Sequence, residues 1–252
     1  MNETPLKSTV RRWGQRFFRL VIQSVVHIHA DGWERMARTG PLIVINNHIN
    51  WLDAVLTYLF APRHLVGFSK IENFDNPLLS PLMRIGGVIP VRRGTPDLAA
   101  VRQALAALEA GEALLVDPEG TRSHHGRLQE ARGGVVLLAL RTGAPIQPVA
   151  VWGQERFWRN LARLLRTRVW IRVGYPFHLR GPETRLRRRQ REEILREVMY
   201  QLAALLPPPY RGVYADLESA TTRYLEFPKG SRNNLTLQDG FTTETQRAQR
   251  DL

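Results

Sequence analysis

The chain has 252 residues, of which 43% are hydrophobic, and it contains no cysteine. This length and apolar content can bury the core of an α/β domain, which excludes disorder of the whole chain, while the lack of thiols excludes a disulfide framework and a cysteine-based zinc site. The formal net charge of +13 indicates an anionic partner, which could be a nucleic acid, a membrane surface or a phosphorylated substrate.

Residues 1–27 are predicted to contain a basic amphipathic helix. From Val10 to Val25 a helical wheel gathers apolar and aromatic residues on one face, and arginine and glutamine on the other. Such a helix suits a membrane interface, although the same pattern would let its apolar face pack on the following domain. No apolar run reaches the roughly 18 residues of a spanning helix, and we expect no secretory signal because the N-terminal segment lacks an uninterrupted apolar stretch. We therefore expect a peripheral protein on the cytoplasmic side of a membrane.

The first polar cluster follows a strand. The apolar run Leu42–Ile45 predicts a buried strand, and the pattern from Trp51 to Phe60 predicts the helix after it. His48 follows the predicted strand, and Asp53 lies in the first turn of the predicted helix. Both residues are therefore near the carboxyl end of the strand, where α/β sheets form ligand crevices. A histidine that a carboxylate holds in one tautomer can take a proton from a hydroxyl at neutral pH. A helix cap or a surface pair is the simpler alternative.

The next elements bring cationic residues to the ends of short strands. His64 to Ser69 predicts a strand that leads to Lys70, and a short helix is expected from Pro77 to Ile85. A third strand follows Gly86-Gly87 and ends at Arg92-Arg93. Two guanidinium forks at this edge could hold a phosphate bidentately, although adjacent arginines are commonly a solvated turn.

A second polar cluster repeats the same layout. A helix over Asp97–Ala110 precedes the strand Ala113–Val116, which ends in the sequence Asp-Pro-Glu-Gly-Thr-Arg-Ser at residues 117–123. An ordinary turn explains the proline, glutamate and glycine, but it does not require the threonine, arginine and serine that follow. The helix Val135–Arg141 and a strand over Ala144–Val151 complete this part of the chain.

Four segments occur in the order of the four motifs of glycerolipid acyltransferases. They are Asn47-His48 with Asp53, Gly87 to Arg93, Glu119 to Ser123, and Ala144 to Val149. Over about residues 32–152 the chain resembles the 1-acyl-glycerol-3-phosphate acyltransferase family. Three positions depart from the usual pattern, because the chain has Asp117 in place of an aromatic residue, Arg92 in place of an acidic one, and Arg132 in place of a lysine.

The resemblance implies the roles of the site residues. His48 would be the general base and Asp53 would orient it, while Arg93 and Arg122 would hold a phosphate. The other residues expected to bind substrate are Glu119, Gly120, Thr121 and, as a weaker candidate, Lys70.

The implied reaction is transfer of an acyl group to the hydroxyl of a lysophospholipid. The donor would be an acyl thioester, either acyl-CoA or acyl carrier protein, and no metal or other cofactor is expected. The favoured acceptor is 1-acyl-glycerol-3-phosphate, with glycerol 3-phosphate or another lyso-lipid as the alternative. The expected fold is a single α/β domain over residues 28–227, with a central mixed sheet flanked by helices.

The C-terminal part of the chain is strongly basic. Between Arg156 and Arg191 there are twelve arginines and a single acidic residue, Glu183. This run is the best support for the competing hypothesis of a basic nucleic-acid-binding protein, but it contains no recognisable reading motif, and Val169–Val173 predicts one more strand within it. A solvated or lipid-facing surface is therefore favoured. A long helix is predicted from residue 183 to 205 and a flexible tail over 228–252.

Overall fold

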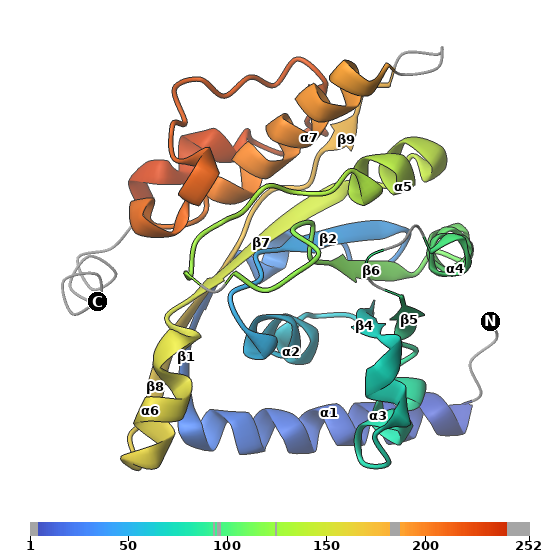
Figure 1. The fold of residues 1–252 in the computed structure, drawn as a ribbon, viewed down its shortest axis with the longest axis vertical. Coiled ribbons are helices and arrows are strands. Elements are labelled where there is room, and N and C mark those ends of the chain that lie inside the picture. Colours follow the sequence, from blue (N-terminus) through green and yellow to red (C-terminus); the bar gives the residue numbers. More distant parts are fainter. Residues whose placement is uncertain (1–4, 93, 95–96, 124, 182–186, 241–252) are drawn as a thin grey trace.

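A six-stranded mixed sheet forms the centre of the protein (Figure 1). The computed structural model describes residues 5–92, 94, 97–123, 125–181 and 187–240. All neighbouring strands of the sheet are parallel except β7 and β8, which are antiparallel, so the expectation of a mixed sheet is confirmed. In spatial order the strands are β1 (Val26–Asp31), β8 (Thr167–Val173), β7 (Ile146–Trp152), β2 (Leu42–Asn46), β6 (Ala113–Val116) and β3 (Leu65–Val66).

Two short ribbons flank this sheet. One pairs β4 (Phe68–Lys70) in parallel with β5 (Ile89–Val91), and the other pairs β9 (His178–Leu179) with β10 (Leu225–Glu226) in antiparallel. The single strand predicted from His64 to Ser69 is therefore divided between β3 and β4. The division falls at Gly67, whose carbonyl accepts a hydrogen bond from the Ile89 amide at the start of the ribbon.

The helices cover both faces of the sheet. In Figure 1, α5 and α7 lie above the sheet, whereas α2 and α1 lie below it. Short 3₁₀ turns cover 33–35, 71–75, 154–156, 208–210, 212–214 and 234–240. The α-helices are α1 (Pro5–Val25), α2 (Trp51–Phe60), α3 (Leu79–Ile85), α4 (Leu98–Glu109), α5 (Gly134–Thr142), α6 (Phe157–Ala162) and α7 (Arg188–Ala203).

The alternation of side chains along β2 divides the core into two layers. Ile43 and Ile45 join the cluster that contains apolar residues of α4, α5 and α7, whereas Leu42 and Val44 join the cluster that contains those of α2. All four side chains are buried. This strand is therefore covered on both faces, which explains why its sequence is a continuous apolar run.

The apolar face of α1 points away from the domain. Trp13 is 65% exposed, and Phe17 and Leu20 are exposed to a similar degree. The other side of the helix makes the contact with the domain, because Arg19 donates from Nε to the Leu59 carbonyl at 3.0 Å. The alternative that the apolar face packs on the domain is thus wrong for these residues. The predicted boundary at residue 27 also shifts slightly, since β1 begins at Val26.

The predicted flexible tail is anchored over its first part. Asn234 is buried, and its Oδ1 accepts a hydrogen bond from the Tyr175 amide at 2.6 Å. Its Nδ2 donates to Gln201 Oε1 on α7 at 3.1 Å. The prediction is wrong for this segment because a polar side chain, rather than an apolar pattern, holds it to the domain. The start predicted for α7, at Glu183, lies outside the described residues, and the described helix begins at Arg188.

Candidate active site

The sheet topology brings the two polar clusters together. Strands β2 and β6 are parallel neighbours, with Ile45 opposite Val116 near their carboxyl ends. The turn that contains His48 and the loop over 117–123 therefore leave the sheet at the same edge, as expected for the ligand crevice of an α/β sheet.

The backbone of His48 is held on both sides by this loop. The His48 amide donates to Oε1 of Glu119 at 2.8 Å, and the His48 carbonyl accepts from the Ser123 amide at 2.7 Å. Both oxygens of Glu119 are occupied, because Oε2 accepts from the Gln129 amide at 2.9 Å. Glu119 thus fixes the main chain around the histidine, with each of its carboxylate oxygens accepting a hydrogen bond from a main-chain amide.

Asp53 is fully buried beside the imidazole. Its Oδ2 lies 3.5 Å from Nδ1 of His48 and accepts a hydrogen bond from the Asn50 amide at 2.7 Å. Its Oδ1 accepts a hydrogen bond from Nε2 of Gln154. Asn50 Oδ1 in turn accepts from the Leu52 amide at 2.8 Å, which completes a capping box at the start of α2. The carboxylate is therefore both a helix-capping group and the neighbour of His48, so the two readings of this pair are compatible.

Asn47 ties the same turn to the neighbouring strand. Its Nδ2 donates to the Val151 carbonyl and its Oδ1 accepts from the Val151 amide, both at 2.8 Å. Together with Gln154, this residue positions the His48 turn from β7 and the segment after it. Gln154 was not among the predicted site residues, and Ser123 was identified only as the end of the third motif, because their partners lie far along the chain.

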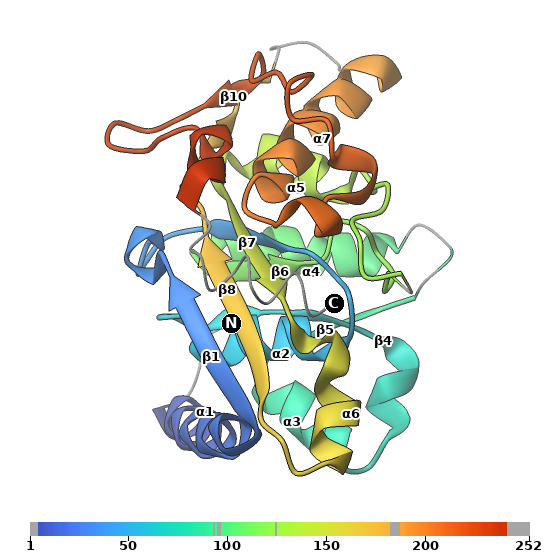
Figure 2. The same ribbon diagram turned by 90° about the vertical axis from the view of Figure 1, so that its left-hand side faces the viewer.

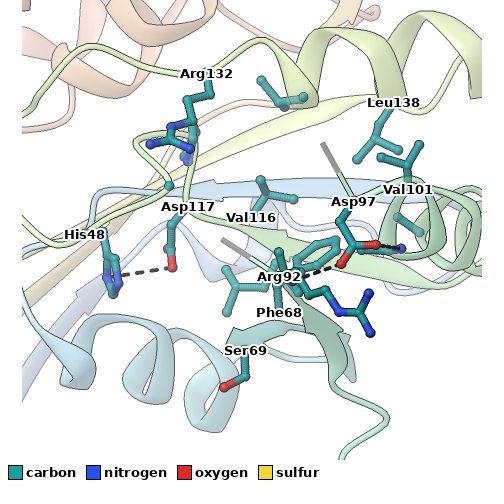
Figure 3. A pocket seen from close by; sticks show the side chains of 18 of the residues that line it. His48, Phe68, Ser69, Arg92, Asp97, Val101, Val116, Asp117, Arg132 and Leu138 are labelled. Atoms are coloured by element: carbon teal, nitrogen blue, oxygen red, sulfur yellow. Dashed lines mark hydrogen bonds and ion pairs between the residues drawn. The ribbon is translucent and has the colours of Figure 1, made fainter. Parts of the chain in front are cut away.

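A second carboxylate approaches the same imidazole nitrogen. Oδ2 of Asp117 lies 3.7 Å from Nδ1 of His48 (Figure 3). Burial opposes protonation of His48, but Asp53, Asp117 and Glu119 outweigh it and raise the pKa of the imidazole above its ordinary value of 6.5. Burial also raises the pKa of Asp53, and it raises the pKa of Glu119 to about 7. From the sequence, Asp117 was only a departure from the usual motif.

A cavity of about 330 Å³ extends from this group into the domain. Figure 3 shows His48 and Asp117 at one end and the apolar side chains of Val101 and Leu138 at the other. The second part of the lining comes from α4 and α5 and is almost entirely aliphatic. The cavity can therefore take a molecule with a polar end near the histidine and a hydrocarbon chain beyond it.

Two arginines line the cavity, Arg132 above Asp117 and Arg92 beside Asp97 and Val101 (Figure 3). Arg132 lies across Gly120, where an added Cβ would stand 3.1 Å from Arg132 Cδ. Gly120 also has a positive φ of 68°, a backbone conformation that favours glycine, and a side chain there would press on that of Arg132. The Arg132 amide donates to the Pro118 carbonyl at 2.8 Å, which fixes the start of this side chain.

None of the remaining predicted side chains that the structure describes belongs to the lining of the cavity. Arg93 falls outside the described residues. Thr121 and Arg122 are exposed on the loop after β6 and do not belong to the described lining of the cavity. Lys70 is exposed at the end of β4, next to the cavity-lining Ser69. The structure thus brings Arg132, rather than Arg122, to the cavity.

Comparisons with known proteins agree with this geometry. A model of the Acyltransferase family matches residues 27–152. The lyso-ornithine lipid O-acyltransferase of Pseudomonas aeruginosa is 28% identical over 219 residues, which cover 80% of this chain and 82% of that protein. A 1-acyl-sn-glycerol-3-phosphate acyltransferase of Limnanthes douglasii is 36% identical over 121 residues, which are 47% of this chain but only 43% of the plant protein.

A solved structure has the same fold. The crystal structure of the 1-acyl-sn-glycerophosphate (LPA) acyltransferase PlsC from Thermotoga maritima matches with a TM-score of 0.60 and 21% sequence identity. The match covers 79% of this chain and 80% of that chain.

Proposed function

The chain belongs to the Acyltransferase family, and from this premise we propose that it transfers a fatty acyl group from a thioester to the hydroxyl of a lysophospholipid in phospholipid biosynthesis. The observation that carries the proposal is the buried His48–Asp53 pair at the mouth of an aliphatic cavity. The donor would be acyl-CoA or acyl carrier protein. We favour 1-acyl-glycerol-3-phosphate as the acceptor, since the plant relative is named for it, with glycerol 3-phosphate or another lyso-lipid as the alternative.

His48 would act as a general base with no covalent acyl-enzyme. With Nδ1 facing Asp53, Nε2 is the nitrogen left to take the proton from the acceptor hydroxyl as its oxygen attacks the thioester carbonyl. The resulting tetrahedral intermediate collapses by breaking the carbon–sulfur bond. The imidazolium then returns its proton to the leaving thiolate, so the histidine ends in its starting form. The thioester supplies the driving force, and the proposed reaction therefore needs no metal or other cofactor.

Arginines would hold the anionic end of the acceptor. Arg92 and Arg132 are the two arginines in the described lining of the cavity, so we propose them as groups that contact the headgroup. Arg93 and Arg122 remain proposals from the family resemblance. A guanidinium suits this role because its fork of donors matches two phosphate oxygens. Glu119 and Gly120 would act indirectly, by positioning His48 and Arg132.

The acceptor resides in a bilayer, so the enzyme would work as a peripheral protein at the cytoplasmic side of a membrane. Within the described parts of the chain, no helix combines the length and the apolar content of a membrane span. The exposed apolar face of α1, with arginines beside it, would make the contact. Membrane lipids and the acyl donor would then be the partners, and no nucleic acid is expected.

The direct test is a product assay. Purified protein would be incubated with a panel of acyl thioesters and with lysophosphatidate, glycerol 3-phosphate and an amine-bearing lyso-lipid, and the products would be identified by mass. We expect a diacylated product from lysophosphatidate with the unchanged chain and none with His48→Ala. A folded protein that acylates no member of the panel would contradict the proposal.

A second assay separates the nucleic-acid alternative. Binding to oligonucleotides and to anionic vesicles would be measured side by side at several salt concentrations. We expect saturable binding to vesicles. Tight oligonucleotide binding without vesicle binding would instead favour the non-enzymatic hypothesis.

A further inference from the structure

Three elements that are distant in the sequence expose large apolar side chains at one end of the molecule. In both Figure 1 and Figure 2 helices α1, α3 and α6 lie together at the lower end of the long axis. Besides the apolar face of α1, this end carries Leu78 and Leu82 of the α3 region and Trp158, Leu164 and Leu165 of the α6 region, all exposed. Such a concentration of exposed apolar groups marks an interaction surface.

The α3 region is joined directly to the cavity. It lies in the connection between β4 and β5, and both strands contribute residues to the cavity lining. At its start Leu78 is 81% exposed, and it is followed by two further exposed leucines at positions 79 and 82. The exposed leucines and the cavity wall thus belong to one continuous piece of chain.

The α6 region ends in a leucine that is exposed to solvent and has an unusual backbone conformation. Leu164 is 93% exposed, and it is the only described residue other than glycine with a positive φ, at 55°. For a leucine this conformation costs roughly 1–2 kcal/mol. The turn that holds it is closed by the Leu165 amide, which donates to the Asn160 carbonyl at 2.9 Å. The positive φ of Leu164 therefore belongs to the turn that ends α6, and this turn leaves an apolar side chain in solvent.

An aromatic cluster connects α6 to the active site. The ring of Trp51, the first residue of α2, lies 5.9 Å from that of Phe157 and 6.1 Å from that of Trp158. Trp51 follows the Asn50 cap that holds Asp53. The surface at α6 and the surface at α3 are thus each joined to a different part of the site.

Positive charge accompanies the apolar groups on two of the three segments. Residues 5–25 and 157–168 contain five and four lysines and arginines respectively, and neither segment contains an aspartate or a glutamate. The connection 71–88, which carries α3, has Arg84 together with the acidic Glu72 and Asp75, so its contribution is the exposed leucines. A surface that combines apolar tips with net positive charge is complementary to an anionic lipid leaflet.

We propose that α1, the α3 region and the α6 region form one docking surface for an anionic bilayer, with Leu78 and Leu164 entering the acyl boundary. The inference rests on the proposed function, because a lipid acceptor must reach the cavity from a membrane. It extends the proposed membrane contact from α1 alone to three segments of the chain. Together these segments would hold the β4–β5 ribbon and the start of α2 close to the leaflet.

The absence of native cysteine allows a direct test in the full-length chain. Single cysteines at Leu78, Leu164 and Val213 would be labelled with an environment-sensitive fluorophore, and vesicles of phosphatidylglycerol and phosphatidylcholine would be added. Val213 is the matched control, because it is 60% exposed but lies beside α7 at the other side of the sheet. We expect a blue shift and a rise in emission at positions 78 and 164 and none at 213.

Charge substitutions give the corresponding loss. Leu78→Glu and Leu164→Glu should each lower the vesicle partition coefficient by on the order of tenfold, which is the weight of one leucine removed from an apolar environment. Val213→Glu should leave it unchanged. Turnover of a short-chain, water-soluble acceptor should persist in all three variants, which also shows that they are folded.

Two results would overturn the proposal. One is that the labels at 78 and 164 stay in water while the protein is bound to vesicles. The other is that they shift without lipid as the protein concentration rises, which would assign the surface to a second copy of the chain. A failure of the proposed function is distinct, because the labels would then report insertion into vesicles by a protein that transfers no acyl group.

Discussion

The His48 turn and the end of the molecule formed by α1, α3 and α6 both depart from the usual distribution of side chains, in which apolar groups are buried and polar groups are exposed. Around His48, polar and charged groups lie inside, and main-chain amides or side-chain amides hold Asp53 and Glu119 in place. At the other end, leucines and tryptophans lie outside with no cover from the domain. The first arrangement fixes one geometry for chemistry, whereas the second provides a surface that gains stability only when a partner covers it. Substitutions in the first region should therefore reduce turnover, whereas substitutions in the second should reduce membrane binding.

The largest effect is expected at the catalytic pair. His48→Ala should abolish turnover with a folded protein, and Asp53→Asn should lower kcat by on the order of 10²–10⁴, the range for acid–base catalysis. The variants would be assayed by product mass, with circular dichroism as the control for folding. Turnover like that of the unchanged chain in a folded His48→Ala protein would refute the mechanism.

Glu119→Gln should have the next largest effect. The carboxylate accepts from two main-chain amides, those of His48 and Gln129, whereas glutamine offers one oxygen and turns a donor toward the second amide. The lost bond should cost about 1–3 kcal/mol of stability, and the displaced histidine should lower kcat by up to about 100-fold. Denaturant unfolding and steady-state kinetics would measure both. An unchanged kcat would show that Glu119 does not position His48.

The contrast between these residues and the missed ones shows what the sequence can reveal. Strands β2 and β6 were predictable because their apolar runs end abruptly in polar clusters, and β7 and β8 from similar runs. The contacts of Gln154 and of Ser123, the last residue of the third motif, were not predictable, because each acts through a hydrogen bond to a residue many positions away. Asn234 was missed for the same reason, since one buried amide anchors a segment with few apolar residues.

Changes at the lipid end should affect only membrane-bound substrate. Trp13→Glu with Phe17→Glu places two charges on the exposed apolar face of α1, so the protein should leave anionic vesicles and lose most activity on acceptor embedded in them. Activity on a short-chain acceptor should remain. Sedimentation with vesicles and the two assays would be run in parallel. If the double variant unfolds, or still sediments with vesicles, α1 is not a main contact.

The cavity arginines should show a smaller, substrate-specific effect. Arg132→Lys keeps the charge but removes the guanidinium fork, so the KM for a phosphorylated acceptor should rise while the KM for the thioester changes little. Arg122→Lys, on the exposed loop, should have a weaker effect than Arg132→Lys if the cavity is the acceptor site. Initial rates with each substrate varied in turn would measure this. Equal losses on phosphorylated and unphosphorylated acceptors would indicate a structural role.

The smallest effect should be a change in the pH profile caused by Asp117. His48 works as a base only when it is neutral, and its pKa is raised above 6.5, so activity should increase with pH through an acid limb that lies above that value. Asp117→Asn removes one of the negative charges that stabilise the imidazolium, which lowers the pKa of His48 and moves the limb to lower pH. The rate on the plateau should change little, because Asp53 still orients the ring.

The matched control for this prediction is Asp97→Asn. Asp97 lines the same cavity, but its carboxylate accepts hydrogen bonds from the amides of Ala99 and Ala100 at the start of α4. Its variant should therefore keep the acid limb of the unchanged chain. The dependence of kcat/KM on pH, measured for the three proteins with one acceptor, decides the matter. A limb that stays in place in Asp117→Asn would mean that Asp53 and Glu119 alone set the pKa of the base, and that the second carboxylate serves another purpose at the cavity mouth.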